Sequence, residues 1–211
     1  MAPFVLLDAK RMPFWLYLPN LIGYVRWATL ILAMLEEDPA STFAVRCLVA
    51  SFALDYVDGP AARKFDMCTQ FGDLLDHFAD HVTMMWLVHV TSSSAANWWI
   101  NAVAMVATLG YMAATGHYFK HAATANWITS TVEAHNYFNM PALLWNANTI
   151  LVPFVKLSYA CEHGIPLKES TEIMDLFDYA GLCVTLLYSG ACVAAALPSS
   201  SAATATKPKG K

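Results

Sequence analysis

Aspartates crowd one part of this chain. Six of them lie between residues 55 and 80, in segments that are otherwise largely apolar: Asp55, Asp58, Asp66, Asp73, Asp76 and Asp80. A carboxylate at the centre of a bilayer costs about 2.5–3.5 kcal/mol, so carboxylates in such segments usually have a partner. The cations of this segment, Arg63 and Lys64, are too few to neutralise six carboxylates. A divalent cation is therefore the expected partner.

The spacing of four of these aspartates indicates a shared metal site. Asp55 and Asp58 are three residues apart, and Asp76 and Asp80 are four apart, so on helices each pair shares one face. Two such helices facing each other would present four carboxylates to one volume. Oxygen ligands without a nearby His or Cys pattern suit Mg²⁺ or Mn²⁺. A site of this kind can hold two ions about 3.5–4 Å apart, an arrangement used for displacement at phosphorus.

These aspartates belong to a longer motif. The segment reads D-x-x-D-G-x-x-A-R from Asp55 to Arg63, and then G-x-x-x-D-x-x-x-D from Gly72 to Asp80. With eight fixed positions over 26 residues, it resembles the signature of the CDP-alcohol phosphotransferase family. The resemblance implies a membrane enzyme of six helices that transfers a substituted phosphate group.

The resemblance also implies a role for each motif aspartate. Asp55, Asp58, Asp76 and Asp80 would hold two divalent cations, Mg²⁺ or Mn²⁺. Asp80 would in addition take the proton from the attacking hydroxyl group, which makes it the expected catalytic base.

Other motif positions would contact the CDP-lipid. The family pattern assigns the CDP moiety to Gly59 and Arg63, with the guanidinium of Arg63 meeting its phosphates as a fork. Thr69 fits a further position that touches the CDP-lipid, and Gly72 would allow close packing near the nucleotide. Pro60, directly after Gly59, is expected to loosen the helix there.

Within the family, the chain is most similar to the eukaryotic branch that transfers the phosphatidyl group of CDP-diacylglycerol to myo-inositol and releases CMP. The similar segments are Pro19–Arg26, Ala62–Phe65, Phe71–Gly72 and Pro141–Leu144. Two features depart from that branch. His81 stands where an Arg is usual, and residues 121–140 contain neither Lys nor Arg.

The missing cations bear on the acceptor alcohol. A phosphate-bearing acceptor would need Arg or Lys in its pocket, whereas a neutral polyol needs hydrogen-bonding groups. The candidates for such groups are His77, His81, His117, His121 and Asn139. We therefore expect myo-inositol. The alternatives are the same chemistry with choline, ethanolamine, serine or glycerol phosphate, or a non-catalytic membrane protein, either a paralogue or an ion-binding or transport protein.

The elements that must carry these residues follow from composition. Hydrophobic residues make up 57% of the 211 and charged residues 13%, with a net charge of -4, which excludes a basic nucleic-acid binder and a disordered chain. A helix that crosses a bilayer needs about 20 mostly apolar residues. The sequence predicts an all-α fold with six such spans: Leu16–Leu35, Thr42–Asp58, Leu74–Val90, Trp98–Tyr118, Pro141–Ala160 and Ile173–Leu197.

The ends of the chain complete the prediction. Residues 2–17 are expected to form a short interfacial helix, residues 1–197 a single membrane domain, and residues 198–211 a disordered basic tail. Lys and Arg gather on the side of the loops that also holds both termini, so both termini are predicted to be cytosolic. Lys207 and Lys209 resemble a retrieval signal of the endoplasmic reticulum. The alternative is an ordinary basic tail that lies near anionic lipid. The expected partners are the bilayer, the two substrates and a second copy of the chain, without nucleic acid.

Overall fold

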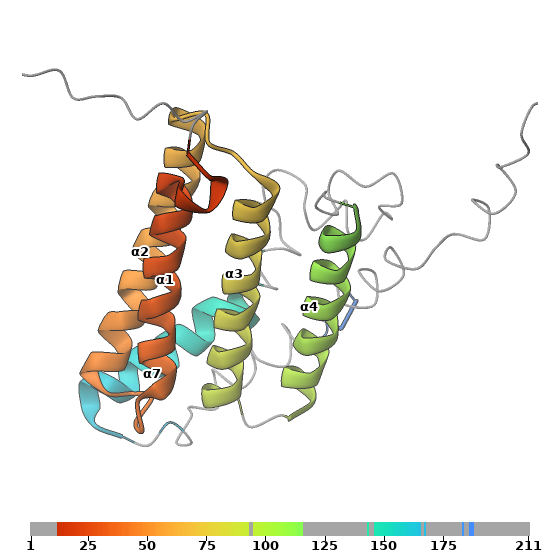
Figure 1. The fold of residues 1–211 in the computed structure, drawn as a ribbon. Coiled ribbons are helices and arrows are strands. Elements are labelled where there is room, and N and C mark those ends of the chain that lie inside the picture. The colour runs from red at the N-terminus through yellow and green to blue at the C-terminus, as the bar shows by residue number, and fades with distance from the viewer. Residues whose placement is uncertain are drawn as a thin grey trace, which may run out of the picture. The chain divides into compact units, whose positions relative to one another are not determined.

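The fold is that of a computed structural model, which describes residues 12–92, 95–115 and 146–165, and five isolated positions besides, 143, 167, 183, 186 and 187. Within these residues every regular element is helical and none is a strand, which confirms the all-α prediction (Figure 1). Several predicted features lie outside the described residues: His117, His121, Asn139, the span Ile173–Leu197 apart from three positions, most of the N-terminal interfacial segment and the tail 198–211.

The helices fall where the apolar stretches predict them. The long ones are α1 (Leu18–Leu35), α2 (Thr42–Lys64), α3 (Gln70–Thr91), α4 (Ala95–Thr115) and α7 (Val152–His163). A 3-10 turn, η2 (Phe14–Leu16), precedes α1, and a π-helical segment, η5 (Ala147–Leu151), leads into α7.

The helix α2 extends beyond its predicted end at Asp58. Pro60 lies inside it, and the helix continues to Lys64. A proline inside a helix removes the hydrogen bond of its own N–H and crowds the carbonyl four residues earlier, here that of Tyr56, but the turns on either side can persist. Pro60 therefore does not end this helix, and the expectation that it loosens the helix stays a prediction. The CDP-lipid motif from Asp55 to Arg63 lies on one continuous helix.

Local backbone chemistry ends α2 and begins α3. Asp66 adopts a positive φ of 54° just past α2, and the N–H of Met67 donates to the carbonyl of Ala62 at 2.9 Å. This is the Schellman arrangement that closes many helices. Five residues after α2 ends, Thr69 caps α3: its Oγ1 accepts a hydrogen bond from the N–H of Gly72 at 3.0 Å.

The described residues belong to two compact units. The first comprises Met1–Trp86 with Val155–Glu169, and the second comprises Leu87–Phe154 with Ser170–Lys211. The first unit thus contains η2, α1, α2, most of α3 and most of α7. The prediction of a single membrane domain over residues 1–197 stays a prediction.

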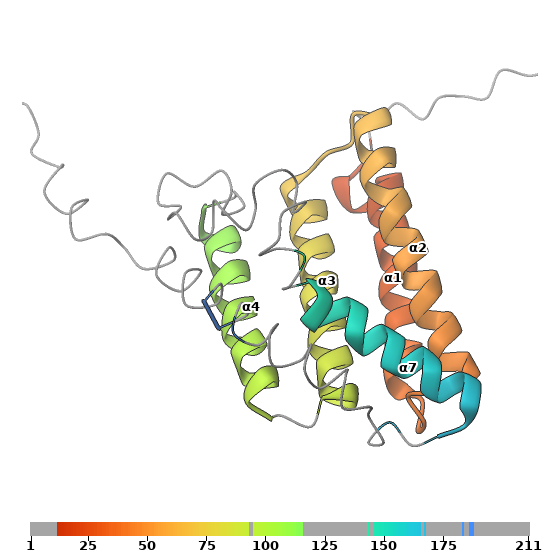
Figure 2. The same ribbon diagram turned by 180° about the vertical axis from the view of Figure 1, so that it is seen from behind.

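In the first unit, α1 and α2 lie side by side along their length in both views (Figures 1 and 2). Leu30 and Ala33 of α1 and Ala44 and Leu48 of α2 are fully buried. On α1, Trp27 faces α3, where its Nε1 donates to the carbonyl of Leu75 at 3.4 Å.

The end of α7 lies beside the start of α2. Cys161 Sγ donates to Thr42 Oγ1 at 3.8 Å, which ties the two helices together where Figure 2 shows them meeting. In the first unit α1 thus contacts both α2 and α3, and the end of α7 lies beside the start of α2.

In the second unit, three buried asparagines form a polar cluster between α4 and η5. Asn97 Oδ1 accepts hydrogen bonds from Asn101 Nδ2 and from Asn148 Nδ2, both at 3.2 Å. Side-chain amides that pair across helices hold them in register where few other polar contacts exist.

The surface of the first unit is strongly apolar. Val25, Ile31 and Leu32 on α1 and Val49 and Val57 on α2 are all about half exposed. Among the described helices, α1 alone is both long and apolar enough to cross a membrane, with a mean hydropathy of 1.4. The other predicted spans stay predictions.

Candidate functional site

Three aspartates from two helices converge in the first unit. Carboxylate oxygens of Asp55 on α2 and of Asp76 and Asp80 on α3 all lie within 4.8 Å of one another. Asp76 and Asp80 share a face because they are one turn apart. Each of the three side chains is between 36% and 38% exposed. These three residues are called the acidic cluster below.

A guanidinium group lies at the acidic cluster. Arg26 on α1 is 2% exposed, and its Nη1 lies 2.8 Å from Asp55 Oδ1 and 2.5 Å from Asp76 Oδ1. Its Nη2 contacts Asp80 Oδ1. One side chain from α1 therefore joins carboxylates of α2 and α3, and all three helices meet at this point.

Arg26 corrects the sequence analysis. The cations nearest to the aspartates in sequence, Arg63 and Lys64, do not pair with the acidic cluster in the contacts of Asp55, Asp76 and Asp80. The nearest cation is instead Arg26, which lies 50 residues from Asp76 along the chain. A signal for it was present, because an Arg inside an apolar stretch is by default a candidate for a functional site.

The ion pairs leave the acidic cluster with an excess of negative charge. A single guanidinium offsets one of three carboxylates, so among the described residues two carboxylates have no cation of their own. Close oxygens with residual negative charge are the donor set that a hard divalent cation prefers. The residues present thus fit such an ion, and the fit rests on oxygen spacing and charge.

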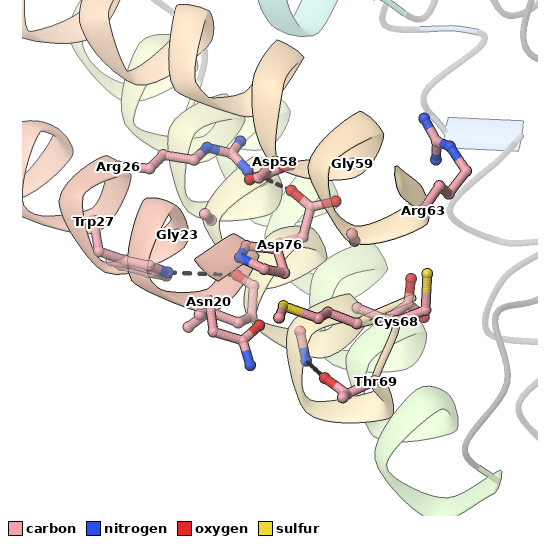
Figure 3. Close-up of a pocket in the computed structure, with 17 residues that line it drawn as sticks. Asn20, Gly23, Arg26, Trp27, Asp58, Gly59, Arg63, Cys68, Thr69 and Asp76 are labelled. Atoms are coloured by element: carbon pink, nitrogen blue, oxygen red, sulfur yellow. Dashed lines mark hydrogen bonds and ion pairs between the residues drawn. The ribbon is translucent and has the colours of Figure 1, made fainter. Parts of the chain in front are cut away.

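A cavity of about 180 Å³ adjoins the acidic cluster (Figure 3). Its wall includes Arg26 from α1, Asp58 and Gly59 from α2, and Gly72 and Asp76 from α3. Asp76 belongs to both the cluster and the cavity, so the two are continuous.

Asp58 is placed differently from the other motif aspartates. It is 9% exposed, lines the cavity and is not part of the group of three whose oxygens lie within 4.8 Å. The expected convergence of four carboxylates is thus seen for Asp55, Asp76 and Asp80, with Asp58 on the adjoining wall.

Gly59 and Arg63 lie one turn apart on α2, and both line the cavity. A Cβ at position 59 would lie 3.5 Å from Nη1 and 3.6 Å from Nη2 of Arg63. The guanidinium of Arg63 therefore covers the bare backbone at Gly59. Figure 3 shows Arg63 and Arg26 reaching the cavity region from different helices.

Thr69 and Gly72 line the cavity at the start of α3. Because Thr69 Oγ1 already accepts the N–H of Gly72, its hydroxyl is part of the helix cap. The remaining hydroxyl hydrogen can still donate to a ligand. Asn20 of α1 faces Gly72, and its Nδ2 donates to the carbonyl of Phe14 at 2.7 Å.

The two described histidines of the expected acceptor pocket do not line this cavity. His77 Nδ1 lies 2.8 Å from the backbone oxygen of Asp73, within α3. His81 is 8% exposed. Both lie on the helix that carries Asp76 and Asp80, one residue after each.

The sequence analysis assigned no role to three α1 residues that line the cavity: Asn20, Gly23 and Trp27. Asn20, Gly23 and Arg26 recur every three residues, which places them on one helical face. All three fall in the segment Pro19–Arg26 that carried part of the family resemblance, so spacing within that segment could have identified the face.

Comparison with protein families gives a match over most of the chain. The profile described as CDP-alcohol phosphatidyltransferase matches residues 16–167. That range contains the acidic cluster, Arg26 and every residue that lines the cavity. It confirms the family resemblance drawn from the motif.

Several curated proteins are similar to shorter stretches. A CDP-diacylglycerol--inositol 3-phosphatidyltransferase of Drosophila melanogaster is 40% identical over 65 residues, which cover 31% of this chain and 29% of that protein. The Candida albicans protein of the same name is 41% identical over 75 residues, 35% of this chain and 32% of its own. The human protein of that name is 36% identical over 73 residues, which cover 35% of this chain and 34% of that protein.

The matched stretches thus span about a third of each of these relatives. No solved structure matches the chain at a significant level.

Proposed function

The chain belongs to the CDP-alcohol phosphatidyltransferase family, and from this we propose that it transfers the phosphatidyl group of CDP-diacylglycerol to myo-inositol, giving phosphatidylinositol and CMP. One observation carries the proposal. Carboxylates from two helices meet beside a cavity whose walls hold the remaining motif residues, among them Gly59, Arg63 and Gly72.

The acidic residues would hold two divalent cations, Mg²⁺ or Mn²⁺. The ligands would be Asp55, Asp76 and Asp80 of the acidic cluster, with Asp58 from the cavity wall. Such ions supply charge neutralisation on a pyrophosphate and its leaving group. The oxygen spacing of the cluster and its residual negative charge support this assignment.

The chain's own groups would perform the remaining steps. Arg63 offers a planar fork to the phosphates of the CDP moiety, Gly59 adds no side chain beside that guanidinium, and Thr69 can donate its hydroxyl hydrogen. Asp80 takes the proton of the acceptor hydroxyl. The acceptor oxygen forms its bond to the phosphorus that carries the diacylglycerol, and the bond from that phosphorus to the oxygen of CMP breaks.

The choice of myo-inositol rests on two observations. The similar curated proteins of fly, yeast and human carry inositol transferase in their names. Residues 121–140 contain neither Lys nor Arg, which suits a neutral polyol rather than a phosphate-bearing acceptor. The half-exposed apolar residues of α1 and α2 support a place in the lipid bilayer, and we assign it to the endoplasmic reticulum with both termini cytosolic.

An acceptor panel tests the proposal. The purified protein in lipid nanodiscs is given CDP-diacylglycerol, Mn²⁺ or Mg²⁺ and one alcohol at a time: myo-inositol, choline, ethanolamine, serine or glycerol phosphate. CMP release that depends on myo-inositol supports the proposal. CMP release with another alcohol, and none with myo-inositol, would indicate that the chain uses that alcohol as its acceptor. Release no greater than that of an Asp80→Asn control with every alcohol contradicts a catalytic role.

A further inference from the structure

Arg26 is the one charged residue of α1, in a helix that is otherwise apolar or neutral. Its guanidinium contacts Oδ1 of Asp55, Oδ1 of Asp76 and Oδ1 of Asp80. These three oxygens belong to carboxylates that the proposed function assigns to divalent cations. A cation ligated by these oxygens would lie within a few ångströms of the guanidinium, and like charges at that separation repel strongly.

The guanidinium is held on one side only. Its two terminal nitrogens contact the acidic cluster, whereas Nε is buried and has no hydrogen-bond partner. A buried donor without a partner is unfavourable. Attraction to the carboxylates therefore holds the side chain in place, and weakening that attraction favours another position.

Space for such a position adjoins the side chain. Arg26 lines the cavity of about 180 Å³, whose wall also includes Asn20 of α1 and Asp58 of α2. Arg63 lines the same cavity from α2. A guanidinium released from the carboxylates could thus turn into the cavity without a change in the helices.

We propose that Arg26 is the counter-ion of the acidic cluster when no divalent cation is bound, and that metal binding displaces its guanidinium into the cavity. This inference rests on the proposed metal site and adds a competitor to it. Arg26 then has two opposite effects: it stabilises the metal-free fold, and it weakens the apparent affinity for the metal. If Arg26 had a merely structural role, it would increase both the stability of the fold and the affinity for the metal.

The experiment measures both effects on the full chain in nanodiscs. Free Mn²⁺ is followed by electron paramagnetic resonance during a titration, and thermal unfolding is recorded in EDTA. For Arg26→Gln we expect Mn²⁺ affinity to rise at least about tenfold because a nearby positive charge is gone. Its metal-free Tm should fall by roughly 5 °C, since the carboxylates lose their counter-ion.

Two further variants complete the design. Arg46 is exposed on α2, about 13.5 Å along the helix from Asp55, so Arg46→Gln removes the same charge from the same unit and should change neither value. Arg26→Lys keeps a cation but cannot bridge several carboxylates as a fork, so its affinity should rise less than that of Arg26→Gln. If Arg26→Gln does not fold, Arg26→Lys carries the test.

The outcomes separate this inference from the proposed function. If the wild type binds Mn²⁺ and the Arg26 variants bind it equally or more weakly, the inference is overturned while the metal site stands. If the wild type binds no Mn²⁺, both the metal site and the inference fail. Tighter binding together with a lower metal-free Tm supports the inference.

Discussion

Gly72 of α3 lies so close to Asn20 of α1 that a Cβ at position 72 would stand 2.6 Å from Asn20 Oδ1. Asn20 cannot easily turn away, because its Nδ2 is bonded to the carbonyl of Phe14. The absence of a side chain at Gly72 thus allows α3, with Asp76 and Asp80, to approach α1, with Arg26.

Gly72→Ala should therefore destabilise the protein. Forcing an extra methyl group into such a contact costs about 1–3 kcal/mol, which outweighs the helix propensity that Ala gains. Gly110→Ala is the matched control, since a Cβ there meets nothing within 4 Å. Thermal unfolding in nanodiscs should show a lower Tm for Gly72→Ala and an unchanged or higher Tm for Gly110→Ala. Equal Tm values would contradict the close contact.

Gly59→Ala should separate stability from substrate binding. The atoms nearest to the new Cβ belong to Arg63, at an ordinary 3.5 Å, and Ala is favoured over Gly within a helix by about 1 kcal/mol. The Tm should stay the same or rise. If CDP-diacylglycerol approaches the backbone at Gly59, KM for that lipid should rise nevertheless. An unchanged KM would remove Gly59 from the proposed binding site.

Thr69→Ala should weaken the start of α3. Loss of an N-cap hydrogen bond costs about 1 kcal/mol, and here the bond is the one from Gly72 N to Thr69 Oγ1. Thr69→Ser keeps the hydroxyl and should retain most of the Tm. Should Thr69→Ser be as unstable as Thr69→Ala, the cap would not be the source of the effect.

Asp80→Asn should abolish catalysis while the protein remains folded. Without a base for the acceptor hydroxyl, CMP release should fall by a factor of about 10²–10⁴. Asp66→Asn removes a carboxylate from the connection between α2 and α3, at a positive φ that Asn tolerates well. That control should keep wild-type rates. Similar losses in both variants would point to a general effect of charge.

Removal of divalent cations should stop the reaction. EDTA is expected to abolish CMP release, and Mg²⁺ or Mn²⁺ should restore it because the candidate ligands are all carboxylate oxygens. The same additions should raise the Tm of the EDTA-treated protein, since a bound ion stabilises the folded state. Full activity in EDTA would exclude the proposed metal chemistry.

The sequence predicted the helices better than it predicted their ends. The apolar stretches at Leu16–Leu35 and Trp98–Tyr118 correspond to α1 and α4 within a few residues. The predicted span ended at Asp58, because the apolar stretch stops there, whereas the helix continues to Lys64. Hydropathy ignores the Schellman motif at Asp66, which is what ends the helix.

The candidate site was predictable where its residues follow a local period. Asp55 with Asp58, and Asp76 with Asp80, could be paired from spacing alone. Arg26 could not be placed in this way, because its contact with Asp76 depends on how α1 packs against α3, and sequence separation gives no sign of it. The number of membrane spans stays a prediction, with α1 the one described helix long and apolar enough to cross a membrane.

The connection from Phe65 to Thr69 has only five residues, and both of its ends are fixed by hydrogen bonds. It acts as a spacer of set length between the helix that bears Asp55 and the helix that bears Asp76. Its backbone thereby determines which carboxylates come face to face. The geometry of the acidic cluster thus depends partly on a short loop that contributes no residue to the cluster itself.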